Sequence, residues 1–246
     1  MRSFFLGDNA VGDGEATVTG ELYRHMARVL RLKEGVEVEL VDGDGRRHSG
    51  VIAEVGAKSL TVRIDATTAA PEPEPGLRIT LYQGLPKGDK LDLILQKCTE
   101  LGIAEVVTFD AARSVVKLRG EKTAGKQARF EKIVQEAARQ CGRSSAPRVA
   151  IGGSLKEVLR DAPQTVKLLL WEGEEKTTLR ECLERYQAPE SVAVVVGPEG
   201  GLTTEEVATA LACGFTPVTL GKRILRTETA GLALVSILQF HWGDLG

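Results

Sequence analysis

The chain has 246 residues, which is enough for one large domain or two smaller ones with a buried core. Hydrophobic residues make up 42% and charged residues 27%, as in ordinary soluble globular proteins, and no apolar run approaches the roughly 20 residues that span a bilayer. The net charge of -2 taken alone argues against a nucleic-acid partner.

The N-terminal part, residues 1–70, has the pattern of a small β-barrel with one helix. The first eight residues, MRSFFLGD, turn acidic without a long apolar segment, so we expect no signal peptide, no membrane partner and a cytoplasmic location. A short helix is predicted over 20–32, and strands are predicted over 36–41, 49–55 and 60–64.

Residues 71–76 separate this part from the rest of the chain. Three prolines at alternate positions remove backbone donors and favour an extended linker. We therefore expect a second domain over residues 77–246.

The second part alternates strands and helices. The run Val192–Val196 is apolar throughout, as in strands that are covered on both faces, so an α/β fold with a parallel sheet is predicted. The predicted strands are 78–83, 105–109, 166–171, 192–196 and 217–220. The predicted helices are 90–101, 121–141 and about 227–241, and further helices are expected to start at the capping boxes Ser154/Glu157 and Thr203/Glu206.

A basic block lies between Ala111 and Arg148, with ten lysines and arginines against three acids. Such a block can be a binding surface for RNA, or it can be a solvated helix face, and its composition does not decide between them.

Cysteines and histidines give no sign of a metal site. The four cysteines, Cys98, Cys141, Cys182 and Cys213, form no CxxC pair, and the three histidines form no HxxxH pair. Reduced core thiols and the absence of a metal cofactor are predicted.

A glycine-rich turn, GPEGGLT, follows the strand that ends at Val196 and precedes a capped helix. At the carboxyl edge of a parallel sheet this is where ligands bind, because glycine lets the backbone approach closely. The turn lacks the lysine of a phosphate loop and the GxGxxG spacing, which disfavours a nucleotide hydrolase. The alternative is a tight strand-to-helix connection without a ligand.

A second such turn, LGKRILRTETA, begins at Leu220 and leads into the apolar final helix. Arg226 and Glu228 lie beside apolar residues, where a charge is costly unless it is paired or takes part in function. They are candidate functional residues, and the alternative is a structural ion pair at the start of the helix.

Together these two turns closely resemble the C-terminal signature of the SPOUT superfamily, and within it the family that methylates N3 of a uridine in 16S ribosomal RNA. The resemblance continues, in order along the chain, through HMARVLRL from His25, LDLILQKCTELG from Leu91, RSVVKL from Arg113, EAARQCGR from Glu136 and FHWGDLG from Phe240. It therefore covers nearly the whole chain.

The resemblance implies an N-terminal PUA-like barrel, a C-terminal domain with a deep trefoil knot, a homodimer, and 16S ribosomal RNA or the small ribosomal subunit as partner. It implies S-adenosylmethionine as cofactor, held by three loops. The cofactor-binding candidates carried over are Trp171, Glu172, Gly173, Gly197, Pro198, Glu199, Gly200, Gly201, Leu220, Gly221, Ile224 and Leu225.

Methylation at N3 requires loss of the N3 proton and stabilisation of charge on the flanking carbonyl oxygens. Arg226 is the candidate for charge stabilisation, and Glu228 either accepts the proton or orients Arg226. The RNA-binding candidates are Arg28, Arg31, Arg113, Gln140 and Arg143.

Two alternatives stay open. One is another SPOUT methyltransferase, acting on a ribose 2′-hydroxyl or on tRNA. The other is an RNA-binding ribosome-assembly factor without catalysis, which would have no need for two glycine loops at one sheet edge.

Overall fold

The computed structural model describes residues 2–6, 9, 11–42, 45–69, 76–115, 122–174 and 176–245. Two compact units make up the chain, Met1–Pro75 with Gly142–Ser145, and Gly76–Cys141 with Ala146–Gly246. The predicted linker 71–76 lies outside the described residues except for Gly76, so the predicted domain boundaries stay a prediction.

The N-terminal unit is a six-stranded sheet in the order β1-β4-β5-β6-β3-β2, with a parallel β1–β4 pair and otherwise antiparallel pairs. Its strands are β1 (Arg2–Phe5), β2 (Val11–Gly12), β3 (Glu15–Val18), β4 (Glu37–Val41), β5 (Arg47–Val55) and β6 (Leu60–Thr68). Alternate residues, such as Val38 and Leu40, face a core that includes Phe4 and Met26.

The short helix of this unit is less regular than predicted. It consists of one α-helical turn, α1 (Gly20–Tyr23), followed by a π-helical segment, η1 (Arg24–Val29). Arg31 follows the segment with a positive φ of 51°.

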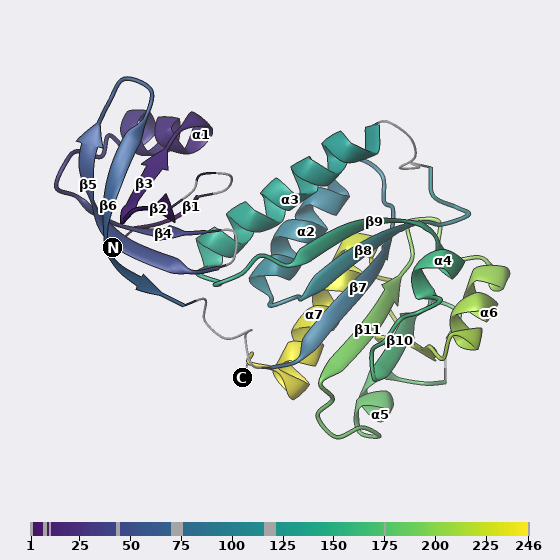
Figure 1. The fold of residues 1–246 in the computed structure, drawn as a ribbon. Coiled ribbons are helices and arrows are strands. Elements are labelled where there is room, and N and C mark those ends of the chain that lie inside the picture. Colours follow the sequence, from purple (N-terminus) through teal and green to yellow (C-terminus); the bar gives the residue numbers. More distant parts are fainter. Residues whose placement is uncertain are drawn as a thin grey trace. The chain divides into compact units, whose positions relative to one another are not determined.

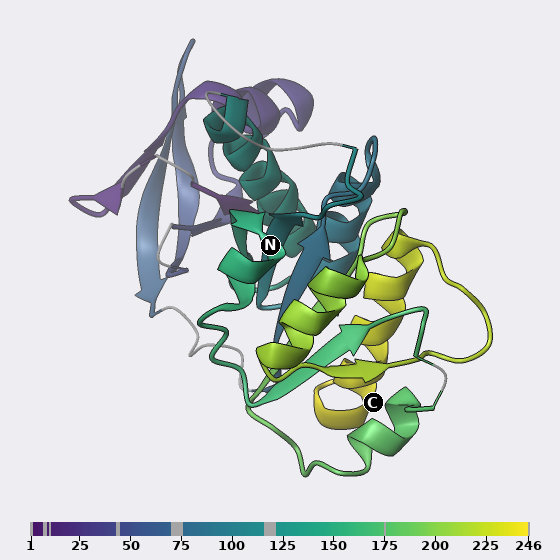
Figure 2. The same ribbon diagram turned by 90° about the vertical axis from the view of Figure 1, so that its right-hand side faces the viewer.

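The C-terminal unit contains a parallel sheet in the order β12-β10-β11-β7-β8-β9, as predicted (Figures 1 and 2). Its strands are β7 (Arg78–Gly84), β8 (Glu105–Asp110), β9 (Arg148–Ser154), β10 (Val166–Leu170), β11 (Ser191–Val196) and β12 (Thr216–Val218). Its helices are α2 (Lys90–Glu100), α3 (Lys122–Cys141), α4 (Leu155–Leu159), α5 (Leu179–Leu183), α6 (Thr204–Ala212) and α7 (Thr227–Trp242).

Alternation along the central strands produces two cores, one on each face of the sheet. In β11, Val192, Val194 and Val196 pack against the core that contains residues of α2, α3, α5 and α7. Ala193 and Val195 face the other core, with residues of α4 and α6. The apolar run therefore belongs to a strand that is covered on both sides, as predicted.

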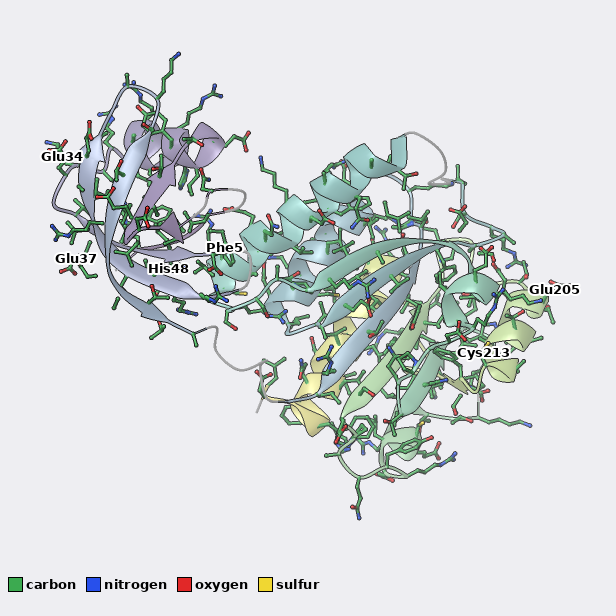
Figure 3. All side chains as sticks on the ribbon, viewed as in Figure 1. Phe5, Glu34, Glu37, His48, Glu205 and Cys213 are labelled. Carbon is green, nitrogen blue, oxygen red and sulfur yellow. The ribbon has the colours of Figure 1, made fainter. Side chains whose placement is uncertain are left out.

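Both predicted capping boxes are present, at Ser154 before α4 and at Thr203 before α6. Thr178 and Glu181 form a third before α5. Figure 3 labels Glu205 and Cys213 near the two ends of α6. The cysteines are free, but Cys141 is exposed and Cys213 half-buried, so the prediction of core thiols is right only for Cys98 and Cys182.

Among the described residues, no helix combines the length and apolar character that crossing a membrane requires.

Candidate active site

Four parallel neighbours, β12, β10, β11 and β7, end at the same edge of the C-terminal sheet. Loops 171–178, 197–203 and 219–226 follow three of them. Two of the loops are tied by their backbones: Thr219 N donates to Thr177 O at 3.0 Å, and Leu179 N donates to Thr219 O at 3.0 Å. The sheet order therefore gathers segments that are about 50 residues apart in the sequence.

These loops enclose a cavity of about 1040 Å³. Of the predicted cofactor-binding and catalytic residues, eleven line it: Trp171, Glu172, Gly197, Pro198, Glu199, Gly201, Leu220, Gly221, Ile224, Leu225 and Arg226. The lining also includes Lys222 and Arg223, which lie within the third predicted loop, and Lys90, Glu174, Thr178 and Thr227, which are not among the candidate residues.

Gly173, Gly200 and Glu228 do not line the cavity. A Cβ at Gly200 would lie 2.9 Å from the Cβ of Arg113, whose Nη1 donates to Gly200 O at 3.0 Å. A Cβ at Gly173 would meet the Trp171 ring at 2.5 Å. The glycine at each of these positions thus makes room for a neighbouring residue of the protein.

Two other glycines allow close packing around the cavity. Gly201 has a φ of +68°, a left-handed conformation that favours glycine, and a Cβ there would lie 2.6 Å from the Glu172 carboxylate. A Cβ at Gly84, the last residue of β7, would lie 2.6 Å from Pro198 Cδ and 2.8 Å from Pro198 N. The end of β7 is therefore packed directly against the loop that follows β11.

Lys90 joins two carboxylates at the cavity. Its Nζ lies 2.8 Å from Glu199 Oε1 and 3.3 Å from Glu228 Oε2. The hydrogen bond to Glu199 is the main reason that the pKa of Lys90 is raised. Burial raises the pKa of Glu199, but the hydrogen bond from Lys90 and backbone donors outweigh it and lower the pKa overall.

Buried polar groups fix the start of α7 beneath the cavity. Thr227 Oγ1 donates to Gly197 O at 2.6 Å and accepts from Gln83 Nε2 at 2.9 Å. Gln83 is fully buried and its Oε1 has no partner among the described residues. These two hydrogen bonds connect β7, the loop after β11 and α7.

Arg226 is the N-cap residue of α7, and its side chain is exposed at the cavity. Glu228 lies in the first turn with 13% of its side chain exposed. The ion pair at the helix start that was the alternative interpretation exists, but it joins Glu228 to Lys90. Within the described part of the chain, no ion pair joins Arg226 to Glu228.

The basic block is partly neutralised. Arg129 pairs with Asp92, Arg139 with Glu136, and Arg148 Nη1 lies 3.3 Å from Glu105. The first two of these contacts favour the solvated-face interpretation for Arg129 and Arg139 of helix α3. Lys117 and Arg119 lie outside the described residues.

The remaining RNA-binding candidates belong to different elements of the two units. Gln140 is exposed in the last turn of α3, and Arg143 lies just beyond the end of this helix in a segment that groups with the N-terminal unit. Arg28 lies in η1 and Arg31 beyond it, and both are exposed.

Metal-ligating side chains do not cluster in the described ranges: no group of three or more histidine, cysteine, aspartate or glutamate residues lies close enough to hold an ion.

Comparisons with known proteins agree with this geometry. The RNA methyltransferase domain family matches residues 72–239, and the RNA methyltransferase PUA domain family matches residues 18–65. The ribosomal RNA small subunit methyltransferase E of Bacillus subtilis is 34% identical over 92% of this chain and 90% of its own length. That of Mycobacterium bovis is 31% identical over 92% and 88%.

Two solved structures share the whole fold. A Neisseria gonorrhoeae ribosomal RNA small subunit methyltransferase E, bound to S-adenosyl methionine, has a TM-score of 0.85 and 33% identity over 100% of both chains. A Legionella pneumophila protein named as a methyltransferase, with bound SAM, has a TM-score of 0.86 and 32% identity over 98% of both chains. Because a family match covers most of the chain and relatives above 30% identity cover it almost completely, this chain belongs to the ribosomal RNA small subunit methyltransferase E family.

Proposed function

We propose that this protein transfers the methyl group of S-adenosylmethionine to N3 of a specific uridine in 16S ribosomal RNA. Membership of the family supports methylation of ribosomal RNA with this cofactor. The observation that carries the proposal is the cavity at the carboxyl edge of the sheet, where all three predicted loops meet. The choice of N3 rests on the resemblance and on the residues at the cavity.

The cavity fits S-adenosylmethionine. Its volume is at the upper end of the range for small-molecule sites, which leaves room for a cofactor and part of a base. Glu172 and Glu174 line it, and their carboxylates suit the positive charges of a sulfonium and an ammonium group, whereas Glu199 is paired with Lys90. When bound, the cofactor supplies an electrophilic methyl group. Loops 171–173, 197–201 and 220–225 would hold it, with Gly173 and Gly200 giving the loops their shape.

The chain's own residues then act on the uracil. Arg226 is exposed at the cavity, so its guanidinium can approach a carbonyl oxygen that gains negative charge as the N3 proton leaves. Glu228 does not line the cavity and pairs with Lys90, which favours orientation of the site over direct acceptance of the proton. A uridine must be exposed from its stack to reach this cavity.

Further features complete the proposal. We expect the exposed arginines Arg28 and Arg31 of the PUA-like unit to contact phosphates of the RNA. We expect a homodimer, because Phe240 and Ile237 of the apolar helix α7 are 73% and 39% exposed in the single chain. The trefoil knot and a cytoplasmic location, where small ribosomal subunits lie, also remain expectations from the resemblance.

Two other functions would give different products in an activity assay. Another SPOUT methyltransferase would place the methyl group on a ribose hydroxyl or in tRNA. A non-catalytic assembly factor would bind the subunit without consuming a cofactor. The cavity favours an enzyme, since a binding module has no need of it.

The test uses purified protein, labelled S-adenosylmethionine and small subunits from a strain that lacks the protein. Nucleosides from the 16S ribosomal RNA are then identified by mass spectrometry. Labelled 3-methyluridine is the expected product. Label in a 2′-O-methyl nucleoside or in added tRNA supports the other enzymes, and subunit binding without label supports the assembly factor.

A further inference from the structure

Lys90 occupies an unusual place for a lysine. It is the first residue of α2, whose N-cap residue Asp89 makes no side-chain capping bond. The amino end of a helix carries partial positive charge, so an ammonium group is unfavourable there. The side chain is about one third exposed, and ion pairs at such exposure generally contribute little to stability. Stability therefore gives no reason for a lysine at this position.

The contacts of Lys90 point to the cavity instead. Its ammonium lines the cavity and bridges Glu199, in the loop after β11, and Glu228, in the first turn of α7. These residues are 109 and 138 positions away in the sequence, so the bridge links three separate segments at one point. Glu199 also accepts a hydrogen bond from Lys87 N at 3.1 Å, which anchors it to the segment before α2.

Arg226 lies next to the residues that this bridge holds. Thr227 is tied to Gly197 by its hydroxyl group, and Glu228 is tied to Lys90. The two ties follow Arg226 directly in the chain, so together they set the direction in which its side chain leaves the helix start. The Thr227 tie is a hydrogen bond between neutral groups, whereas the Glu228 tie is an ion pair with a lysine that lines the cavity.

We infer that Lys90 is a positioning residue of the methyl-transfer site, because its ammonium holds the start of α7, and with it Arg226, against the loop of residues 197–201. The inference rests on the proposed function. Without the ammonium, the Glu199 and Glu228 carboxylates that it bridges are left as two neighbouring like charges, which repel one another. The Thr227–Gly197 hydrogen bond then ties the loop to the helix start without the ion pairs, and both the cofactor loop and Arg226 shift under the repulsion.

The test compares Lys90→Met, which keeps the length of the side chain, with Lys90→Arg, which keeps the charge. The matched control is Lys97→Met, which removes an ion pair with Glu100 at 2.8 Å from the same helix but does not line the cavity. The readouts are calorimetric affinity for S-adenosylmethionine, affinity for 16S ribosomal RNA, and the single-turnover rate with both saturating.

In Lys90→Met, we expect the rate to fall roughly a hundredfold, as for a site displaced by about 1 Å. Cofactor affinity should fall several-fold, RNA affinity should stay unchanged, and Lys90→Arg should recover most of the rate. The double variant Lys90→Met/Glu228→Gln should be no slower than Lys90→Met, because the pair acts as one unit.

A normal rate in Lys90→Met, a fully additive loss in the double variant, or an equal loss in Lys97→Met would overturn the inference. If the wild-type protein makes no 3-methyluridine, the proposed function fails, whereas calorimetry still decides whether Lys90 supports the cofactor loop.

Discussion

Gly84 ends strand β7 where the loop after β11 leaves no space for a side chain. A Cβ there would lie 2.6 Å from Pro198 Cδ, whereas carbon atoms in ordinary contact lie about 3.5–4.0 Å apart. In Gly84→Ala the loop must therefore retreat by roughly 1 Å, and overpacking of this kind costs about 1–3 kcal/mol of folding free energy. If this loop holds the cofactor as proposed, a shift of that size should weaken S-adenosylmethionine binding on the order of tenfold or more.

The assay is calorimetry of cofactor binding together with urea unfolding, and the control is Gly125→Ala. Gly125 is exposed in α3, and a Cβ there would meet no neighbouring group of the described residues within 4 Å, so alanine should raise stability by about 0.5–1 kcal/mol. Its cofactor affinity should stay unchanged. If Gly84→Ala binds the cofactor as tightly as the wild-type protein, the contact between β7 and the loop does not support binding.

Three further predictions follow from the same structure. Arg226→Ala should slow single-turnover methylation on the order of a hundredfold, as for a lost charge-stabilising donor, and leave RNA affinity nearly unchanged; a normal rate would make it a binding or structural arginine. Arg28→Ala with Arg31→Ala should weaken RNA binding and flatten its log-log salt dependence by roughly one unit per lost phosphate contact, and an unchanged slope would exclude phosphate contacts. Iodoacetamide should modify the exposed Cys141 first, because burial raises the pKa of Cys98 to about 12, and peptide mapping would reveal any other order.

Most of the C-terminal sheet could be predicted because its strands are buried and therefore consist mainly of apolar residues. The apolar run of β11 requires cover on both faces, and the glycines after it mark the carboxyl edge. Strand β9 (Arg148–Ser154) escaped prediction because Gly152 and Gly153 lower its strand propensity. A Cβ at Gly152 would lie 2.2 Å from Val158 Cγ1 and 2.8 Å from Thr108 O, so close packing with β8 and α4 requires glycine there.

The cavity could be predicted only in part, for a different physical reason. The lining loops follow strands in a recognisable way, whereas Lys90 becomes part of the site only through side-chain contacts across more than 100 residues. In the sequence it reads as a polar residue at a helix start. Its position at the amino end of a helix is unfavourable for a lysine, but it does not by itself indicate a binding site, and Lys97 of the same helix pairs locally.

Glycines in a loop at a sheet edge have two physical explanations that sequence alone does not separate. Gly201 needs its left-handed backbone at the cavity, while its neighbour Gly200 makes room for Arg113. Arg113 in turn donates to the carbonyl oxygen of Gly200, so this candidate for RNA contact also holds the loop of residues 197–201 in place. A loss of activity in Arg113→Ala would therefore not identify an RNA contact by itself. Arg113→Lys retains the positive charge but replaces the guanidinium whose Nη1 makes this bond. Retained RNA affinity with weakened cofactor binding in that variant would assign Arg113 to the loop, and the reverse would assign it to the RNA.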